Sequence, residues 1–470
     1  MIAARRAQRS FADGFIAEEV ADLWEPWMRQ ADQVLEDDGL LTLIQQELTR
    51  RVKKSKTRGR PGTPAEVVLR MLVLKHVRDY SFEELSREVR ANLVYREFTR
   101  IGGGKTPDDK TMGRLARQLR PEVIRQIHDR VVAMAKEENI VQGRRMRVDT
   151  TVVETNIHYP TDSSLLGDGV RVLTRVMKKI GGIAGEVGAK LRDRSRSVKL
   201  RVLDIARAAR SKVPQSQEKL KKAYGKLLDS TGRVIGQAKR FSQEIAEGVK
   251  RSADILQQAA LEGLRKEIDT MLPRVRQVIR QTRARIFGGD THAENKLLSI
   301  FEPSTEVIRK GKAGKPNEFG KMVKVQEAEN QIVTDFEVYE QRPSDSDLLI
   351  PSIQAHEQKL GCAPYLVAAD AGFYSAKNEK DAIEKGVKRV CVPSRSTKSA
   401  ERKREQKKPW FRSGQKWRTG CEGRISVLKR RHGLNRSRYK GDDGMKRWVG
   451  LGVIADNLIN IGRMRSQETG

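Results

Sequence analysis

Three acidic residues occupy three different sequence settings that together suit the binding of divalent metal ions. Asp149 lies in RMRVDTTVVET and Asp370 in YLVAADAGFYS, both short apolar runs of β type, whereas Glu422 lies in the basic, helix-compatible stretch WRTGCEGRISVLKRR. Mg²⁺ prefers oxygen ligands and keeps several waters, so three carboxylates can serve two ions. Two ions roughly 4 Å apart can activate a nucleophile and stabilise the leaving oxygen of a phosphodiester. The three residues therefore predict Mg²⁺ held against a nucleic-acid phosphate.

The distances along the chain require a large insertion between the first two acids. Asp149 and Asp370 are 370 − 149 = 221 positions apart, and Glu422 follows Asp370 after 422 − 370 = 52 positions. A long helical insertion would account for the first gap. Carboxylates alone are weak support, because the chain has 61 Asp and Glu, and an isolated Asp is usually a surface or turn residue.

The composition favours a polyanionic partner. The chain of 470 residues carries 93 Lys and Arg against 61 Asp and Glu, a formal net charge of +32. Counterion release from DNA or RNA drives the binding of such proteins. A membrane is the rival polyanion, but no apolar run approaches the ~20 residues of a transmembrane helix, and the N-terminus lacks the apolar core of a signal peptide. We therefore expect a cytoplasmic protein without a membrane partner.

Several other classes of protein fit the sequence poorly. The three cysteines form no CxxC pair, which argues against a zinc ribbon or a disulfide framework. The GGGK run at 102–105 lacks the spacing and the preceding strand of a phosphate-binding loop, so no nucleotide cofactor is expected. An aromatic content of 5% argues against binding of single strands by base stacking as the main activity.

The N-terminal part of the chain has a helical character. Residues 1–60 form a mixed extension that ends in the basic run RRVKKSKTRGRPG. Residues 61–140 contain several short helices with tight turns, and Ser81 and Glu84 have the spacing of a capping box. This pattern resembles a helix-turn-helix DNA-binding domain. A plain helical bundle that only supports the rest of the protein is the alternative.

The remainder alternates between strand and helix signals. Residues 141–164 and 287–465 carry the strands, with a hairpin at KMVKVQEA and QIVTDFEVYEQ and a βαβ unit from YLVAAD to KRVCVP. Residues 165–286 form a helical insertion, in which two heptad-like stripes predict long helices packed antiparallel. Pro273 is expected to kink or end the second helix. The basic segment 394–409 is expected to be a mobile loop.

The settings of the three acids resemble those in bacterial insertion-sequence transposases of the DDE class. DTTVVETNIHYPTDSSLL and DAGFYS are similar to the segments around the first and second Asp of that family. Arg418 lies four positions before Glu422 and Lys429 seven after it, which matches the R-x3-E-x6-K part of the family signature. Gln415 stands where the signature has Tyr. With its helical insertion, the chain looks closest to the group called ISNCY, and the resemblance covers roughly residues 60–465.

This resemblance implies a fold and a set of functional residues. The fold is an α/β ribonuclease-H-like catalytic core, a mixed sheet with flanking helices, together with the N-terminal helical domain and the coiled-coil-like insertion. The resemblance implies that Asp149, Asp370 and Glu422 bind Mg²⁺, for which Mn²⁺ can substitute, and that they are catalytic. On a helix, Arg418 and Lys429 would lie one and two turns from Glu422 and could contact phosphates of the DNA. The neighbouring basic residues Arg430 and Arg431 are included in this DNA-binding set, although a solvated helix face is the alternative interpretation.

Nearby acidic residues receive other roles. Glu154 lies on the opposite strand face from Asp149 and is a weaker alternative ligand. Asp345 and Asp347, in RPSDSDLL, are expected to cap a helix.

The resulting hypothesis is a DDE transposase that cleaves DNA at transposon ends and joins the 3′-hydroxyl to target DNA. Its partners would be double-stranded DNA, at the terminal inverted repeats and the target site, and further copies of the same chain on that DNA. A bacterial, nucleoid-associated location follows. Two alternatives remain open at this stage: a ribonuclease-H-like nuclease that cuts without joining, and a catalytically inactive, basic DNA-binding or architectural protein.

Overall fold

The computed structural model describes residues 1–6, 11–50, 61–185, 187–210, 215–291, 296–309, 316–394 and 397–468. The chain divides into two compact units, one formed by Met1–Asn156 and Glu306–Gly470 and the other by Ile157–Thr305. Most of the basic run expected near residue 55 lies outside the described residues. No helix in the described ranges is long and apolar enough to cross a membrane.

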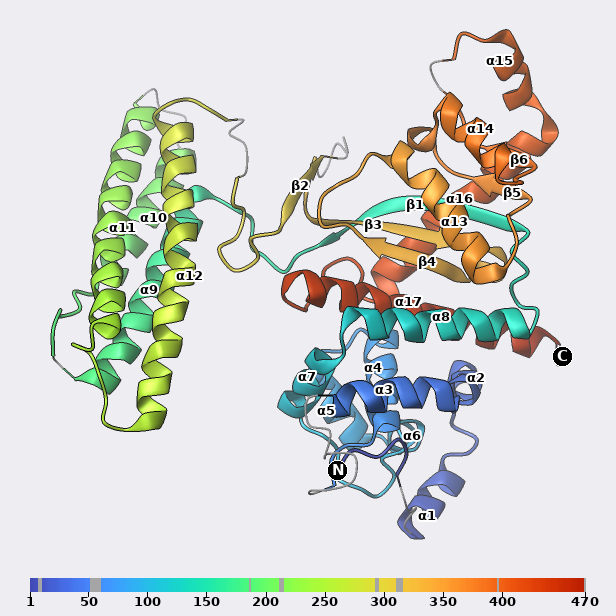
Figure 1. The fold of residues 1–470 in the computed structure, drawn as a ribbon, viewed down its shortest axis with the longest axis horizontal. Helices are drawn as coiled ribbons and strands as arrows, with labels where there is room; N and C mark the ends of the chain where they lie inside the picture. Colours follow the sequence, from blue (N-terminus) through green and yellow to red (C-terminus); the bar gives the residue numbers. More distant parts are fainter. Residues whose placement is uncertain are drawn as a thin grey trace. The chain divides into compact units, whose positions relative to one another are not determined.

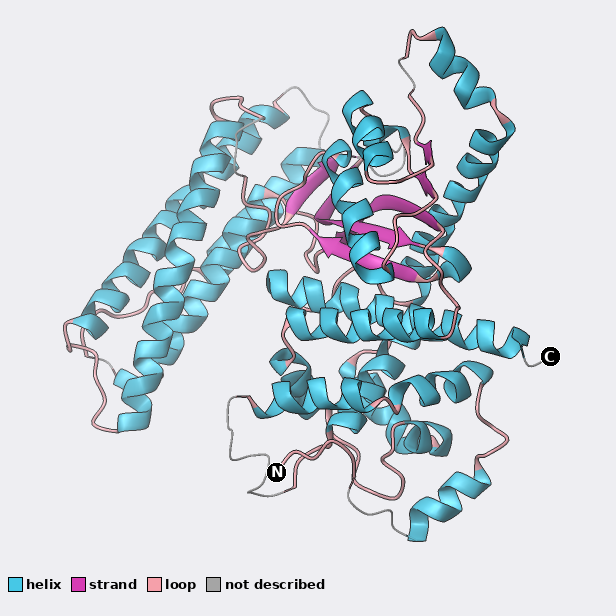
Figure 2. Cartoon of the chain, turned by 45° about the vertical axis from the view of Figure 1, so that its right-hand side comes forward, coloured by secondary structure: helices cyan, strands magenta, loops and turns pink. Residues whose placement is uncertain are grey.

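A six-stranded mixed sheet forms the centre of the first unit (Figure 2). The central strand β1 pairs antiparallel with β3 on one side and parallel with β5 on the other, and β6 continues the parallel part. The far edge of β3 pairs antiparallel with both β2 and β4. The strands are β1 (Arg145–Glu154), β2 (Glu306–Arg309), β3 (Asn317–Glu327), β4 (Val333–Val338), β5 (Leu366–Ala368) and β6 (Arg389–Cys391).

Both strand motifs predicted from the sequence are confirmed. β3 and β4 form the antiparallel hairpin around the turn Glu329–Gln331. β5, α14 (Ala376–Glu384) and the parallel strand β6 form the βαβ unit. Ser375 begins α14 by accepting a hydrogen bond from the backbone N–H of Asn378. The expected mixed sheet with flanking helices is therefore present.

The alternating side chains of β1 face two different helical layers. Met146 and Val148 belong to a buried cluster with Ile353 of α13 (Leu349–Leu360). Val153 belongs to another cluster, with Leu428 of α16 (Pro409–Arg431) and Trp448 of α17 (Gly441–Glu468). Since successive side chains of a strand point to opposite faces, the odd-numbered residues of β1, Asp149 among them, share the face covered by α16 and α17.

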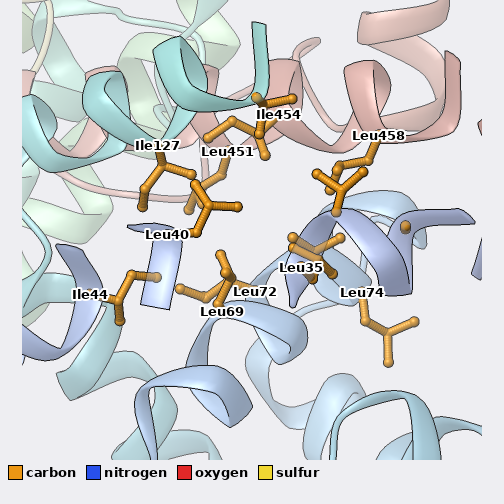
Figure 3. Packing of buried hydrophobic residues seen from close by; sticks show 14 of the residues in the cluster. Leu35, Leu40, Ile44, Leu69, Leu72, Leu74, Ile127, Leu451, Ile454 and Leu458 are labelled. Atoms are coloured by element: carbon orange, nitrogen blue, oxygen red, sulfur yellow. The ribbon is translucent and has the colours of Figure 1, made fainter. Parts of the chain in front are cut away.

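Helix α17 joins the sheet to the N-terminal helices. Its Trp448 packs in the cluster beneath the sheet. Its Leu451, Ile454 and Leu458 pack with N-terminal residues such as Leu72 (Figure 3). A helix that is apolar on opposite faces must be buried on both, as the middle of α17 is here. The N-terminal helices are α1 (Phe11–Glu19), α2 (Pro26–Leu35), α3 (Asp38–Thr49), α4 (Ala65–Val77), α5 (Phe82–Ala91), α6 (Leu93–Phe98), α7 (Asp109–Gln118) and α8 (Pro121–Glu137).

The second unit is helical and has a hydrophobic core of its own. It contains α9 (Asp162–Ala184), α10 (Ser195–Arg210), α11 (Ser216–Ala246) and α12 (Ile255–Ile286), shown in green and yellow in Figure 1. Ser242 of α11 donates a hydrogen bond to Asp269 of α12 at 2.6 Å, and Tyr224 lies 3.5 Å from Arg285. The two helices therefore run antiparallel, as predicted.

Two local expectations are corrected. Of the kink or end predicted at Pro273, the end is wrong: helix α12 continues to Ile286, because buried residues on both sides of the proline, such as Ile268 and Val275, pack it against its neighbours. The expected basic loop contains the helix α15 (Ala400–Lys407), which Ser399 caps. Arg402 of α15 pairs with Glu379 and donates a hydrogen bond to the carbonyl of Val392 at 2.8 Å. These polar contacts hold the segment, which has no row of apolar side chains to pack.

Candidate active site

Asp149 of β1 and Asp370, which follows β5, each lie two residues beyond the last pair of the parallel register between these strands. β1 and β5 pair Arg145 with Leu366 and Arg147 with Ala368, an offset of 368 − 147 = 221 positions. Asp149 and Asp370 have the same offset and continue this register by one further pair of residues on the same face. Asp370 lies two residues after the last residue of β5, beyond the carboxyl end of the strand, where α/β sheets gather their functional groups.

Arg418 connects Asp149 to Glu422. The Arg418 guanidinium lies 3.8 Å from the Asp149 carboxylate and donates to the Glu422 carboxylate at 3.0 Å. The two contacts come about because α16 packs on β1 and because Arg418 and Glu422 are one helical turn apart. Arg418 and Asp149 are 15% and 17% exposed, whereas Glu422 is 61% exposed. A cation therefore stands between two of the three predicted metal ligands.

Asp370 and Asp345 both lie near Gly372. Asp370 caps the short helix Ala371–Phe373 and accepts a hydrogen bond from the N–H of Gly372 at 2.8 Å. Asp345 accepts a hydrogen bond from the hydroxyl of Thr150, the neighbour of Asp149, at 3.1 Å. The prediction that Asp345 caps a helix is wrong, because Ser344 holds the cap position and no side chain makes a capping hydrogen bond there.

The donor atoms at this edge of the sheet suit Mg²⁺, which takes carboxylate oxygens as ligands. In the described parts of the chain, no three His, Cys, Asp or Glu side chains converge to hold a metal ion. The Arg418 guanidinium supplies a positive charge between Asp149 and Glu422. A Cβ on Gly372 would lie 3.1 Å from an oxygen of Asp345 and 3.1 Å from one of Asp370, so the glycine leaves open the space that a larger residue would fill.

A buried ionic network fixes α16 against β1. Arg147 binds both oxygens of Glu327, at 2.6 and 2.9 Å, and donates to the backbone carbonyl of Trp417 at 2.6 Å. Arg424 of α16 binds both oxygens of Asp456, at 2.7 and 3.0 Å. Burial raises the pKa of Glu327, and the neighbouring Arg147 and Arg424 oppose that rise. These contacts fix the position of α16, and so of Arg418 and Glu422, relative to Asp149 on β1.

Gln415 makes a further connection that could not be predicted from the sequence. Its side-chain amide donates to the carbonyl of Cys391 at 2.7 Å and to that of Ala369 at 3.3 Å. Ala369 immediately precedes Asp370. The residue that replaces the signature Tyr therefore ties α16 to the carboxyl ends of β5 and β6.

The other predicted residues lie further along these elements. Lys429 is half-buried, and Arg430 and Arg431 are exposed at the end of α16. Arg430 and Arg431 line a surface depression that Arg78 and Arg463 also line. Basic residues of α16 and α17 thus share one surface with the end of α4.

Glu154, the alternative ligand, pairs with Arg436 at 3.0 Å. This ion pair directs its carboxylate toward the loop after α16, and five positions of β1 separate it from Asp149.

Two segments of the chain match known families. Residues 27–118 match the family described as Transposase domain (DUF772), and residues 378–462 match the family described as Transposase DDE domain. The second match contains α16 with Arg418, Glu422 and Lys429, while Asp149 and Asp370 precede it. No curated protein and no solved structure matches the chain. Both matches are to transposase families, and together they support an insertion-sequence transposase of the DDE class, an enzyme that cleaves DNA and transfers the cut strand.

Proposed function

We propose that Asp149, Asp370 and Glu422 are the catalytic acids of this transposase and bind its divalent metal ions. The main support for this proposal is that Asp149 and Asp370 each lie two residues beyond Arg147 and Ala368, the last pair of the parallel register between β1 and β5. The contacts of Arg418 with Asp149 and Glu422 bring the third acid to the same edge. The mixed order of the strands supports a ribonuclease-H-like core as the scaffold of these acids.

The metal ions, Mg²⁺ or Mn²⁺, would activate water for cleavage and then the 3′-hydroxyl for strand transfer, and would stabilise the leaving oxygen. The protein's own contribution is to orient the acids. Asp149 is held by a hydrogen bond from the N–H of Thr150 at 2.7 Å, and Asp370 by that from Gly372. Both acids are therefore positioned by their local backbone, which lowers the cost of assembling the site.

Arg418 would exchange its partners when the metals and DNA bind. If divalent metal ions were bound at Asp149 and Glu422, the Arg418 guanidinium would be available to a DNA phosphate, which it can bind in bidentate fashion. Lys429, Arg430 and Arg431 would extend this contact along α16, and Arg463 would continue it on the neighbouring depression. We propose this surface as the path of the transposon end.

The N-terminal helices would supply a second DNA contact. Helix α4 is buried along nearly its whole length, so it cannot lie in a DNA groove while the core is intact. The exposed faces of α5 and α7 are the candidates in a helix-turn-helix-like role. We propose terminal inverted repeats and target DNA as the DNA partners, with oligomers of the chain pairing the two ends in the bacterial nucleoid.

A test of this function uses labelled DNA that carries the ends of the element, with Mg²⁺ and a target duplex. The wild-type protein should produce a cut end with a 3′-hydroxyl and a product joined to the target. Asp149→Asn should give neither product, whereas Glu154→Gln, which alters the neighbouring acid of β1, should give both. Cutting without joining by the wild type would support the nuclease alternative. Equal loss of the two products in both variants would mean that Asp149 is no more important for catalysis than Glu154.

A further inference from the structure

Helix α11 of the second unit carries a long row of positive charge on its exposed face. The row consists of Lys219, Lys222, Lys226, Arg233 and Arg240, and the exposed bases Lys221 and Lys239 lie beside it. We propose that this basic row of α11 binds the phosphate backbone of duplex DNA, independently of the DNA sequence. The second unit would then hold DNA in addition to the contacts proposed for the first unit. The inference does not depend on the assignment of the catalytic acids.

The bases of the row share one side of α11 because of their spacing. They follow one another at intervals of three, four, seven and seven residues, which keeps them on one face of an α-helix. The opposite face, with Leu227, Val234 and Phe241, is buried in the core of the second unit. From Lys219 to Arg240 the row covers 240 − 219 = 21 residues, or about 31 Å at the usual helical rise. A partner can therefore reach the whole row without disturbing the core.

The charges of this row are not neutralised within the chain. Among the described residues, none of the seven bases of α11 forms an ion pair with a carboxylate. Each of the other helices of the second unit pairs some of its bases with acids. These ion pairs include Arg171–Asp168, Arg175–Glu267, Lys178–Asp193, Arg201–Asp204, Arg265–Glu262 and Arg285–Asp162. The positive charge that is free to meet an anionic partner is thus concentrated on α11.

Further arginines lie beside the row near its carboxyl end. Arg194 donates a hydrogen bond to the side chain of Gln237, one helical turn after Arg233, at 3.2 Å. Burial lowers the pKa of Arg194, and the charges of Arg192 and Arg233 lower it further. Like charges that lie this close repel each other, and a bound anion relieves the repulsion. The two arginines that precede α10 therefore widen the basic row of α11.

Duplex DNA is the polyanion that this face fits. A small anion is held by bases that converge on one point, whereas these bases are spread along a line. The line is close in length to one turn of duplex DNA, about 34 Å. Duplex DNA presents a negative charge for about every 1.7 Å of its axis. The aromatic residues of α11, Tyr224 and Phe241, are buried, so the helix offers no rings on which the bases of a single strand could stack.

The test measures binding of the full-length protein to a mixed-sequence duplex that lacks the ends of the element. Fluorescence anisotropy at several salt concentrations gives the slope of log affinity against log salt. The row variant combines Lys222→Gln, Lys226→Gln, Arg233→Gln and Arg240→Gln. Its slope should be smaller by about 0.9 for each phosphate that is no longer neutralised, or by about 3.6 if each base holds one phosphate. Thermal unfolding checks that the fold is retained, as expected for exposed side chains without ion pairs.

A matched control removes the same amount of charge from the same unit. It combines Arg171→Gln, Arg175→Gln, Lys178→Gln and Arg265→Gln, four bases that already pair with acids. This control should keep the slope of the wild type. A single variant tests the exposed face of α11 in the opposite direction. Asp229→Asn removes an exposed acid between Lys226 and Arg233 and should tighten binding, because the acid repels phosphate.

The outcomes decide between DNA and other roles for the row. An unchanged slope in the row variant would overturn the proposal. An equal reduction in both fourfold variants would also overturn it, because net charge alone would then explain the effect. An unchanged slope together with loss of self-association in sedimentation would assign the row to an acidic surface of another copy of the chain.

Cleavage at low salt separates this inference from the proposed function. The row variant should still cut the ends of the element with Mg²⁺, because none of its changed residues belongs to the proposed active site. If the wild type cuts nothing while the slope of the row variant falls as expected, the proposed catalytic acids fail and the basic row of α11 stands. If the wild type cuts and the slope does not fall, the acids stand without the row.

Discussion

The guanidinium of Arg418 lies 3.8 Å from the carboxylate of Asp149 although the two residues belong to different layers of the protein, a helix and the central strand. The same guanidinium binds Glu422 at 3.0 Å. An arginine that belongs to the family signature thus joins the first and third acids of the proposed site. In this arrangement Arg418 competes with any metal ion for the same two carboxylates.

Replacing Arg418 should therefore affect metal binding and cleavage in opposite directions. In Arg418→Gln the two acids lose a cationic neighbour, so Mn²⁺ should bind about tenfold more tightly. Cleavage should fall by about tenfold or more, because the DNA loses a bidentate phosphate partner. Titration with Mn²⁺ and a cleavage assay measure the two effects. Lys416→Gln, on the same helix, should change neither. Weaker metal binding in Arg418→Gln would mean that the arginine supports the site instead of competing for it.

Two glycines of α16 should respond differently to alanine. A Cβ on Gly420 would lie 2.1 Å from the guanidinium of Arg147, whereas a Cβ on Gly423 would meet nothing within 4 Å. Gly420→Ala should destabilise the protein by about 1–3 kcal/mol, the usual range for overpacking. Gly423→Ala should be neutral or stabilise it by up to about 1 kcal/mol through helix propensity. Denaturant unfolding measures both. Equal effects at the two positions would contradict the close packing of α16 on β1.

The exposed bases at the end of α16 should determine the salt dependence of DNA binding. Arg430→Ala and Arg431→Ala should each weaken binding to any DNA sequence. Each should also reduce the slope of log affinity against log salt by about 1 for every phosphate that the variant no longer neutralises. Arg412→Ala, an exposed residue at the other end of the helix, is the control. Fluorescence anisotropy at several salt concentrations gives the slopes. An unchanged slope in both variants would place the DNA on another surface.

Lys75 should make the stability depend on pH. Its ammonium is 1% exposed and lies over the rings of Trp448, Phe82 and Tyr439, at 4.3, 5.1 and 5.4 Å. Burial, with a smaller effect of Arg438, lowers its pKa from 10.5 to about 7. Between pH 7 and 10.5 the unfolded chain binds a proton that the folded chain does not, so stability rises with pH across this window. Below pH 7 both the folded and the unfolded chain bind this proton, so the destabilisation caused by burying the charged Lys75 no longer changes with pH.

Lys75→Met should remove this dependence. At pH 7 the variant should be more stable than the wild type by about 1–4 kcal/mol, the range found when a buried charge is replaced by an apolar side chain of similar size. The advantage should shrink as the pH rises toward 10.5. Denaturant unfolding at several pH values measures it, with the exposed Lys110→Met as the control. A variant less stable than the wild type would show that the three rings stabilise the cation by more than burial costs.

Local patterns predicted the elements whose side chains alternate or repeat regularly. The strands of the β3–β4 hairpin and of the βαβ unit could be recognised because each has apolar residues with polar turns between them. The spacing of Arg418 and Glu422 by four residues was sufficient to predict that they meet on one helix. The helix does not end at Pro273, one of the two outcomes predicted there, because intrinsic helix propensity is a weak guide for a helix that is packed along its length, as α12 is.

The pairings that depend on the tertiary fold could not be predicted in this way. Asp345 accepts a hydrogen bond from Thr150, 195 positions away in the sequence, and its own sequence setting, SDSD, is that of an ordinary cap. Gln415 reaches carbonyls on two different strands, which no local pattern encodes. Both are long-range pairings between polar groups, and a sequence without a clear period carries no signal for them.

The sharpest test of the proposed site compares Mg²⁺-dependent cleavage of the element's own ends by the wild type and by Asp370→Asn. The substitution removes one charge at the carboxyl end of β5 and retains the size of the side chain. We expect cleavage by the wild type alone, with DNA affinity unchanged or slightly higher in the variant, while Asp381→Asn on the following helix cleaves normally. Equal cleavage by the wild type and Asp370→Asn would contradict the assignment of Asp370 to the metal site.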